Sequence, residues 1–230
     1  ATDCLLANGA NRENAAAVAR TIAKAERDGS SSHGFFRLPG YIASLKSGKV
    51  NGTAKPTVST LTSSIIQIDG DNGYAPLALE TGIPDLVAVA SKTGVGIGAV
   101  VNMYHFAALW PEVESIADYG MVGFACTAFK PSVAPAGATL PLFGTNPMAF
   151  AWPRKKNRPM VFDMATAAMA KGEIQIAARD GHLLPEGVGL DTNGNPTTDP
   201  EAVLDGVMLP FGGYKGANLA MMIELLVAAL

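Results

Sequence analysis

The sequence predicts a mixed α/β or α+β fold with one main sheet, because helical and strand patterns alternate along its 230 residues. Hydrophobic residues make up 48% of the chain and charged residues 16%. This balance is typical of a globular protein with a sizeable core, and it excludes a disordered or fibrous chain. We find no internal repeat, low-complexity tract or linker in the sequence.

The first third of the chain contains two predicted helices and a strand. Apolar residues recur at helical spacing over residues 11–27 and 35–45, and a glycine follows each stretch as a stop signal. Residues 57–69 alternate β-branched and polar side chains, which predicts a strand that ends at a turn over residues 69–73.

The remaining elements follow from the same patterns, and the last predicted helix runs to the final residue without a cap or polar tail. We therefore expect a chain that is truncated at its C-terminus. We predict helices over 76–92, 106–119, 165–179 and 214–230, strands over 95–101, 121–127, 148–152 and 160–163, and a turn-rich loop over 191–200.

The net charge and the lengths of the apolar runs argue against nucleic acid and membranes as partners. Seventeen Lys and Arg against 20 Asp and Glu give a net charge of −3, so no basic surface favours nucleic acid or an anionic membrane. An anionic ligand must therefore meet a locally placed cation. The sequence has no apolar run of membrane-spanning length, no signal-peptide pattern and only two cysteines, so we expect a cytoplasmic protein.

Two motifs resemble known binding sites but do not match them fully. Residues 94–99 match the glycine spacing of a dinucleotide fingerprint, yet a helix precedes them and a strand follows, the reverse of a Rossmann unit. Residues 191–202 begin like a calcium loop but have Pro196 and Ala202 where Gly and Glu are needed. The three histidines share no zinc spacing, so we predict no metal site.

The most suggestive polar group is Ser32-His33, which lies between two glycines and is placed to exchange protons near neutral pH. Arg37 follows four residues later and can hold a carboxylate with two parallel hydrogen bonds. The alternatives are a surface histidine and a surface salt bridge.

Four further segments are candidates, each with a structural alternative. His105 precedes a predicted helix and can cap it or bind a ligand there. The turn around Thr145 and the helix start after Asp163 can be purely structural. Residues 212–216, Gly-Gly-Tyr-Lys-Gly, predict either a phosphate cradle or a flexible loop.

Taken together and in this order, the motifs resemble those of the malate/L-lactate dehydrogenase family of NAD(P)-dependent oxidoreductases, which is unrelated to the Rossmann-type lactate dehydrogenases. The resemblance spans nearly the whole chain. It rests on Ser32-His33-Gly34, Arg37-Leu38-Pro39-Gly40-Tyr41, His105-Phe106, Ala134-Pro135, Phe143-Gly144-Thr145-Asn146-Pro147, Asp163-Met164-Ala165-Thr166, Pro196-Thr197-Thr198-Asp199-Pro200 and Gly212-Gly213-Tyr214-Lys215-Gly216.

Within the family, the chain is most similar to bacterial delta-1-piperideine-2-carboxylate/delta-1-pyrroline-2-carboxylate reductases, which use NADPH to reduce cyclic imino acids to pipecolate and proline. The resemblance implies a non-Rossmann NAD(P)-binding fold with a predominantly antiparallel central sheet, and a homodimer. NADH is a possible second cofactor. We expect residues 1–56 to form a helical segment with the Ser-His pair, and residues 57–230 to form the cofactor and substrate domain, incomplete at its C-terminus.

The resemblance also implies the site residues. Ser32, His33 and Glu173 would form a catalytic relay in which His33 donates the proton that the reduced nitrogen needs. Arg37 would hold the substrate carboxylate. Thr145, Lys171 and Gly172 would also line the substrate pocket, and the cofactor contacts would come from His105, Phe106, Ala107, Ala108, Leu109, Asp163, Met164, Ala165, Tyr214 and Lys215.

Two residues depart from those reductases: Glu173 replaces an Asp, and Tyr214 stands where His is more common. Two alternatives therefore remain. One is a 2-hydroxyacid dehydrogenase that acts on malate, lactate, sulfolactate or ureidoglycolate, since a 2-keto acid needs similar proton delivery. The other is a non-catalytic nucleotide-binding remnant.

Overall fold

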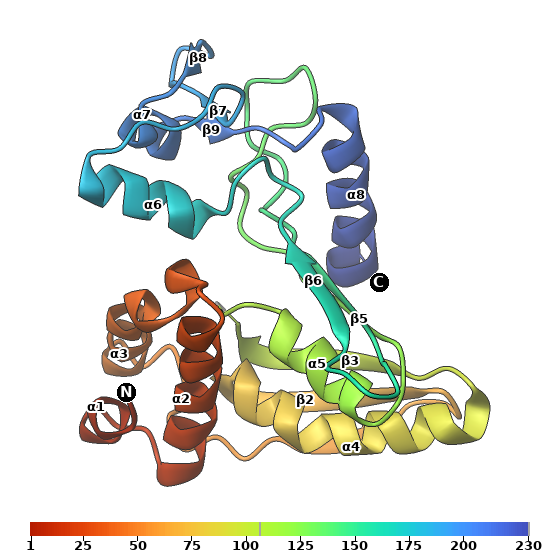
Figure 1. The fold of residues 1–230 in the computed structure, drawn as a ribbon. Helices are drawn as coiled ribbons and strands as arrows, with labels where there is room; N and C mark the ends of the chain where they lie inside the picture. Colours follow the sequence, from red (N-terminus) through yellow and green to blue (C-terminus); the bar gives the residue numbers. More distant parts are fainter. Residues whose placement is uncertain (106, 230) are drawn as a thin grey trace. The chain divides into compact units, whose positions relative to one another are not determined.

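The computed structural model describes residues 1–105 and 107–229, which form two compact units of helices and strands (Figure 1). The first unit comprises Ala1–Val122 and Trp152–Pro159, and the second comprises Gly123–Ala151 and Met160–Leu230. The expected division into residues 1–56 and 57–230 stays a prediction. In the described part of the chain, no helix is long and apolar enough to cross a membrane.

The mixed α/β class is confirmed, but the one main sheet is not. Among the described residues, the strands form three three-stranded sheets with the orders β1-β2-β3, β4-β5-β6 and β8-β7-β9. Most of the strand pairs are antiparallel, and the pairing of β2 with β3 is parallel.

The first unit begins with the helices α1 (Thr2–Ala7), α2 (Arg12–Arg27) and α3 (Leu38–Lys46). Asn11 caps α2 because its side chain accepts the Asn14 backbone N–H at 2.9 Å, as expected of Asn at this position. Two 3₁₀ turns, Ser31–His33 and Phe35–Arg37, connect α2 to α3. The core between these helices includes Leu5, Val18, Ile22, Tyr41 and Tyr74.

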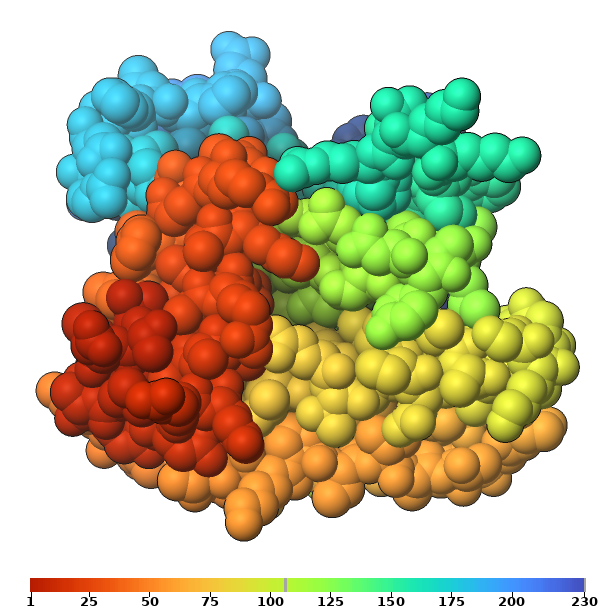
Figure 2. Space-filling view, turned by 60° about the horizontal axis from the view of Figure 1, so that its bottom comes forward, coloured from red at the N-terminus to blue at the C-terminus, as the bar shows by residue number. Residues whose placement is uncertain are grey.

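The sheet of the first unit contains β1 (Thr57–Thr60), β2 (Ile65–Tyr74) and β3 (Ile97–Tyr104), with α4 (Ala75–Thr93) as the crossover between the parallel strands. Gly82 of α4 leaves no room for a Cβ against Ile68 of β2, so glycine permits this close packing. In the space-filling view, α4 adjoins the strands on one side and α5 (Trp110–Asp118) on the other (Figure 2).

The predicted single strand over residues 57–69 is wrong, because it is divided between β1 and β2. The predicted turn over 69–73 lies inside β2, where the chain continues through a bulge with Asp71 and Asn72 at φ 51° and 54°. The helix predicted from residue 106 begins at Trp110, and Phe106 lies outside the described residues. Gly94 ends α4 at φ 85°, which confirms the helix-to-strand turn in place of a Rossmann fingerprint.

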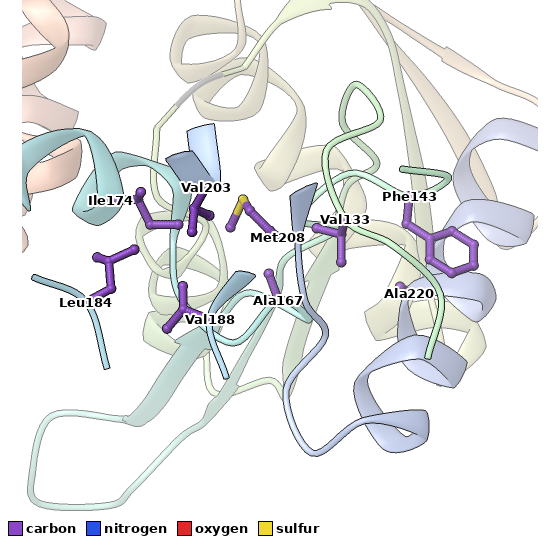
Figure 3. Packing of buried hydrophobic residues seen from close by; sticks show 9 residues of the cluster. All are labelled: Val133, Phe143, Ala167, Ile174, Leu184, Val188, Val203, Met208 and Ala220. Carbon is purple, nitrogen blue, oxygen red and sulfur yellow. The ribbon is translucent and has the colours of Figure 1, made fainter. Parts of the chain in front are cut away.

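The second unit combines two sheets with three helices, and its larger apolar cluster is drawn in Figure 3. Its larger strands are β4 (Gly123–Cys126), β5 (Met148–Trp152) and β6 (Met160–Met164). Its core cluster consists of Val133, Phe143, Ala167, Ile174, Leu184, Val188, Val203, Met208 and Ala220. The other elements are α6 (Lys171–Asp180), β7 (Gly189–Leu190), β8 (Pro196–Thr197), α7 (Pro200–Asp205), β9 (Val207–Met208), α8 (Tyr214–Glu224) and a π-helical turn, Leu225–Ala229.

The helix predicted over residues 165–179 is wrong over its first six residues. Residues 165–170 are not helical, since Thr166 donates its backbone N–H to the Thr145 carbonyl and Ala167 forms a bridge with Pro210. Tertiary pairing therefore overrides the helix propensity of the alanines, and α6 starts at Lys171. The last predicted helix is confirmed up to Glu224, and its final residue lies outside the described part.

Candidate functional site

The Ser32-His33 pair lies in a tightly held turn of the first unit. His33 Nδ1 is 3.0 Å from the Ser32 hydroxyl and 3.3 Å from the Ser30 hydroxyl, and Ser32 is buried. Glu26 of α2 accepts the Phe35 backbone N–H at 2.6 Å. Gly34 has no room for a Cβ against that carboxylate, so glycine lets Glu26 hold the turn.

The electrostatic surroundings keep the His33 imidazole neutral. Burial is the largest of three causes that together lower the pKa of His33 from its ordinary 6.5 to about 4; the other two are the nearby charges of Arg37 and His105. The described part of the chain therefore brings Arg37 and His105 close to His33. At neutral pH this imidazole can accept a proton, and an added negative charge would favour its protonated form.

Arg37 is a partly buried cation, and the described part of the chain places no counter-charge beside it. Its Nε is closed off from solvent and has no hydrogen-bond partner among the described residues, and no described carboxylate lies within ion-pair distance of it. Its guanidinium lies 5.6 Å from the centre of the Phe36 ring, and burial lowers its pKa. Because burying an unpaired charge is costly, the arrangement favours a bound anion at this place, and the alternative of a surface salt bridge is wrong.

His105 follows the end of β3 and precedes α5. Its Nε2 is 3.1 Å from Oε1 of Glu112, and the Ala107 backbone N–H points to its Nδ1 at 3.4 Å. The capping alternative for His105 is wrong, since α5 has no side-chain cap. Sequence reasoning missed Glu112, because a Glu in the first turn of a helix is common and nothing in the sequence pairs it with His105.

Thr145 lies in the second unit, where its carbonyl accepts the backbone N–H and the hydroxyl of Thr166, both at 2.9 Å. This contact joins the Thr145 turn to the segment that follows β6. The expected cofactor residues Asp163 and Met164 end that strand, and Ala165 comes next. The structure therefore brings two expected groups of site residues together within this unit.

Asn146 explains why the Thr145 turn is rigid. Its fully buried amide donates to the Ala220 carbonyl at 3.1 Å and to the Glu224 carboxylate at 2.8 Å, and its oxygen accepts the Phe129 N–H at 3.2 Å. Asn146 has φ 34°, in the left-handed region that Asn tolerates. The amide therefore holds the turn against α8.

Lys171, Gly172 and Glu173 form the first turn of α6, where Gly172 is buried and Glu173 is exposed. No side chain caps this turn, and the Glu173 backbone N–H donates to the Ala170 carbonyl at 3.0 Å. His33 belongs to the first unit and Glu173 to the second. The relay between these two residues therefore stays a prediction.

The start of α8 fits a phosphate-containing cofactor. Gly212 and Gly213 have φ 55° and 62°, and no atom would meet a Cβ built on Gly213. The first turn has no side-chain cap and carries the exposed Tyr214 and Lys215. The N–H groups of Lys215 and Gly216 already donate to the carbonyls of Gly212 and Phe211, so what this helix start offers a phosphate is an open glycine surface and one cation. This observation favours the cradle over a simple flexible loop.

Comparison with known proteins agrees with this geometry. Residues 1–230 match the malate/L-lactate dehydrogenase family. A delta(1)-pyrroline-2-carboxylate/delta(1)-piperideine-2-carboxylate reductase of Pseudomonas putida is 50% identical over 97% of this chain and 66% of its own. A delta(1)-pyrroline-2-carboxylate reductase of Ancylobacter novellus is 46% identical over 99% of this chain and 67% of its own.

Solved structures give the same result. The delta1-piperideine-2-carboxylate reductase of Pseudomonas syringae matches with a TM-score of 0.94 and 47% identity, over 98% of this chain and 68% of that chain. Sulfolactate dehydrogenase of Methanocaldococcus jannaschii matches with a TM-score of 0.86 and 36% identity, over 98% of this chain and 65% of that one. The chain thus spans about two thirds of the length of its relatives. It belongs to the malate/L-lactate dehydrogenase family.

Proposed function

We propose that this protein is an NADPH-dependent reductase of cyclic imino acids, which converts delta-1-piperideine-2-carboxylate to pipecolate and delta-1-pyrroline-2-carboxylate to proline. The observation that carries the proposal is the Arg37 guanidinium beside His33, whose buried Nε has no hydrogen-bond partner among the described residues. It places an anion-binding cation next to a proton-exchanging imidazole, as a 2-carboxylate next to a C=N bond requires. The names of relatives 46–50% identical to this chain support the choice of substrate.

In this proposal Arg37 binds the substrate carboxylate and thereby fixes which face of the ring is presented. Ser32 holds the His33 ring through Nδ1, and His33 delivers the proton that the reduced nitrogen needs. The nicotinamide cofactor, when bound, supplies the hydride. His33 is neutral without ligands, and two proposed negative charges, the substrate carboxylate and Glu173, favour its protonation.

The remaining expected residues keep their proposed roles. The substrate pocket would include Thr145, Lys171 and Gly172. The start of α8 would hold cofactor phosphates through Tyr214 and Lys215, and further cofactor contacts would come from His105–Leu109 and Asp163–Ala165. The preference for NADPH over NADH, the homodimer and the cytoplasmic location belong to the same proposal.

The similarity to sulfolactate dehydrogenase supports one alternative, a 2-hydroxyacid dehydrogenase. Arg37 and His33 would serve a 2-keto acid in the same way, because it has a carboxylate next to the carbon that accepts the hydride. The imino acid is preferred because the named reductases share more identity with this chain, at 46–50% against 36%.

The test follows NADPH oxidation by the gene product at its full encoded length. Delta-1-piperideine-2-carboxylate, delta-1-pyrroline-2-carboxylate, pyruvate, oxaloacetate and sulfopyruvate are compared as substrates, and NADH replaces NADPH in a parallel series. We expect turnover with the two cyclic imino acids and a higher kcat/KM with NADPH. Turnover of a keto acid without turnover of either imino acid would instead establish the dehydrogenase.

A further inference from the structure

His105 and Glu112 form a buried pair in the first unit. Their side chains are only 6% and 8% exposed, and His105 Nε2 lies 3.1 Å from Glu112 Oε1. Glu112 occupies the first turn of α5, where the helix dipole favours a carboxylate. The pair therefore belongs to the interior of this unit, unlike the exposed ion pair of Arg20 with Glu80.

The backbone specifies which ring nitrogen carries the proton. The Ala107 N–H points to His105 Nδ1 at 3.4 Å, and a backbone N–H can only donate. Nδ1 must therefore present its lone pair, and in a neutral ring the proton is on Nε2. The Nε2–H then donates to Glu112, so two contacts on opposite sides of the ring select one tautomer and one orientation.

Glu112 has no competing ion pair in the described part of the chain. Two cations, Arg20 and Lys24, line the same 410 Å³ surface pocket as Glu112. Arg20 pairs there with Glu80, and Lys24 pairs with Glu114. The second oxygen of Glu112 is buried and has no hydrogen-bond partner among the described residues. A buried carboxylate that uses one oxygen costs stability, which favours a functional reason for its presence.

The partner of Glu112 lies at the candidate site. His105 lies close enough to His33 that a protonated His105 would lower the pKa of that imidazole. His105 also begins the segment expected to contact the cofactor. The orientation of the His105 ring therefore decides which of its polar atoms faces the site that contains His33.

We propose that Glu112 is a positioning residue, which holds the His105 ring in its Nε2–H form beside His33 through the hydrogen bond to Nε2. It acts through His105 and touches neither substrate nor cofactor. The kinetic part of this proposal rests on the proposed function, whereas the tautomer and the affinity for NADPH do not depend on it.

The experiment uses the full-length gene product and the variants Glu112→Ala, Glu112→Gln and Glu114→Ala. Glu114 is the matched control, because it lies on the same helix and pairs with Lys24 instead of His105. Long-range proton–nitrogen NMR reports the tautomer of His105, whose signals are assigned by their loss in His105→Gln. Fluorescence titration gives the Kd for NADPH, and steady-state kinetics give kcat and KM.

We expect wild-type His105 to be the Nε2–H tautomer. In Glu112→Ala the ring signals should change, the Kd for NADPH should rise and kcat should fall, each about tenfold to a hundredfold, as found when the partner that orients a functional histidine is removed. Glu112→Gln keeps an oxygen acceptor and should remain within about threefold of wild type, since a hydrogen bond is what it must supply. Glu114→Ala should match wild type in all three measurements.

Several results would overturn the proposal: an Nδ1–H tautomer in wild type, unchanged ring signals and constants in Glu112→Ala, or an equal loss in Glu114→Ala. If Glu112→Ala does not fold, Glu112→Gln decides, because a loss of tenfold or more there shows that the hydrogen bond is not sufficient. Lack of imino acid turnover in wild type contradicts the proposed function instead, and leaves the NMR and binding results to judge Glu112.

Discussion

Replacing Arg37 with methionine should stabilise the folded protein. Arg37 Nε is shielded from solvent and lacks a hydrogen-bond partner among the described residues, so the folded state carries a desolvation cost that the unfolded state does not. Methionine has a similar unbranched stem and no charge. Because the site is adapted to bind an anion, its stability without one is expected to be below the optimum.

The size of the effect follows from two opposing contributions. Replacing buried ionic groups with apolar residues stabilises proteins by about 1–4 kcal/mol, and the contact of Arg37 with Phe36, at 5.6 Å from the ring centre, returns about 0.5–1 kcal/mol. Since Arg37 is only partly buried, we expect a net gain of about 1–2 kcal/mol. At roughly 2–4 °C for each kcal/mol, the Tm should rise by several degrees.

The assay is calorimetric unfolding in a buffer without carboxylates, with Arg20→Met as the control. Arg20 is exposed and paired with Glu80, so its loss should lower stability by about 0–1 kcal/mol. Added proline should raise the Tm of wild type by binding to the folded state, and should not affect Arg37→Met. A Tm of Arg37→Met below that of Arg20→Met would refute the reasoning, because it would mean that Arg37 has a stabilising partner in the free protein.

Two further predictions concern stability in each unit. The pKa of His33 falls from 6.5 to about 4 on folding, so protonation of this ring favours the unfolded state. The free energy of unfolding should therefore decrease as the pH falls from 6.5 to 4, by at most about 3 kcal/mol. Urea unfolding between pH 7 and 4 should show this decrease in wild type and a smaller one in His33→Asn. If the free energy of unfolding falls equally with pH in both proteins, the prediction is wrong. Asn146→Ala removes three buried-amide hydrogen bonds and should cost about 3 kcal/mol in urea unfolding, whereas a cost below about 1 kcal/mol would show that α8 does not hold the turn.

The sequence predicts elements best where local chemistry decides them. Asn11 and the alanine-rich stretch after it define α2 to within one residue, and the glycine at 94 ends α4 as expected. Prediction from the sequence fails where contacts between residues distant in sequence determine the backbone conformation. The alanines from residue 165 favour a helix, yet pairing with Thr145 and Pro210 keeps this segment out of a helix. In the same way, β2 passes through a Gly-containing segment that has the composition of a turn.

The residues of the candidate site also divide into those whose roles the sequence indicates and those whose roles need the fold. Ser32, His33 and Arg37 are close in sequence, so their spacing alone suggested a shared place, and their contacts within the first unit agree. Glu112 and Asn146 could not be assigned their roles from the sequence, because these depend on burial and on partners from other segments. A buried polar side chain is recognised as such only once the surrounding core is known.

The most direct test of the central claim removes the carboxylate from the substrate. The full-length gene product and its Arg37→Met variant are compared on delta-1-piperideine-2-carboxylate and on delta-1-piperideine, which lacks the carboxylate. A bidentate charge-assisted pair is worth about 3–4 kcal/mol, so wild type should prefer the carboxylated imine by roughly two to three powers of ten in kcat/KM, and Arg37→Met should lose most of that preference. If the preference is the same in both proteins, Arg37 does not hold the substrate carboxylate and the proposed site is wrong.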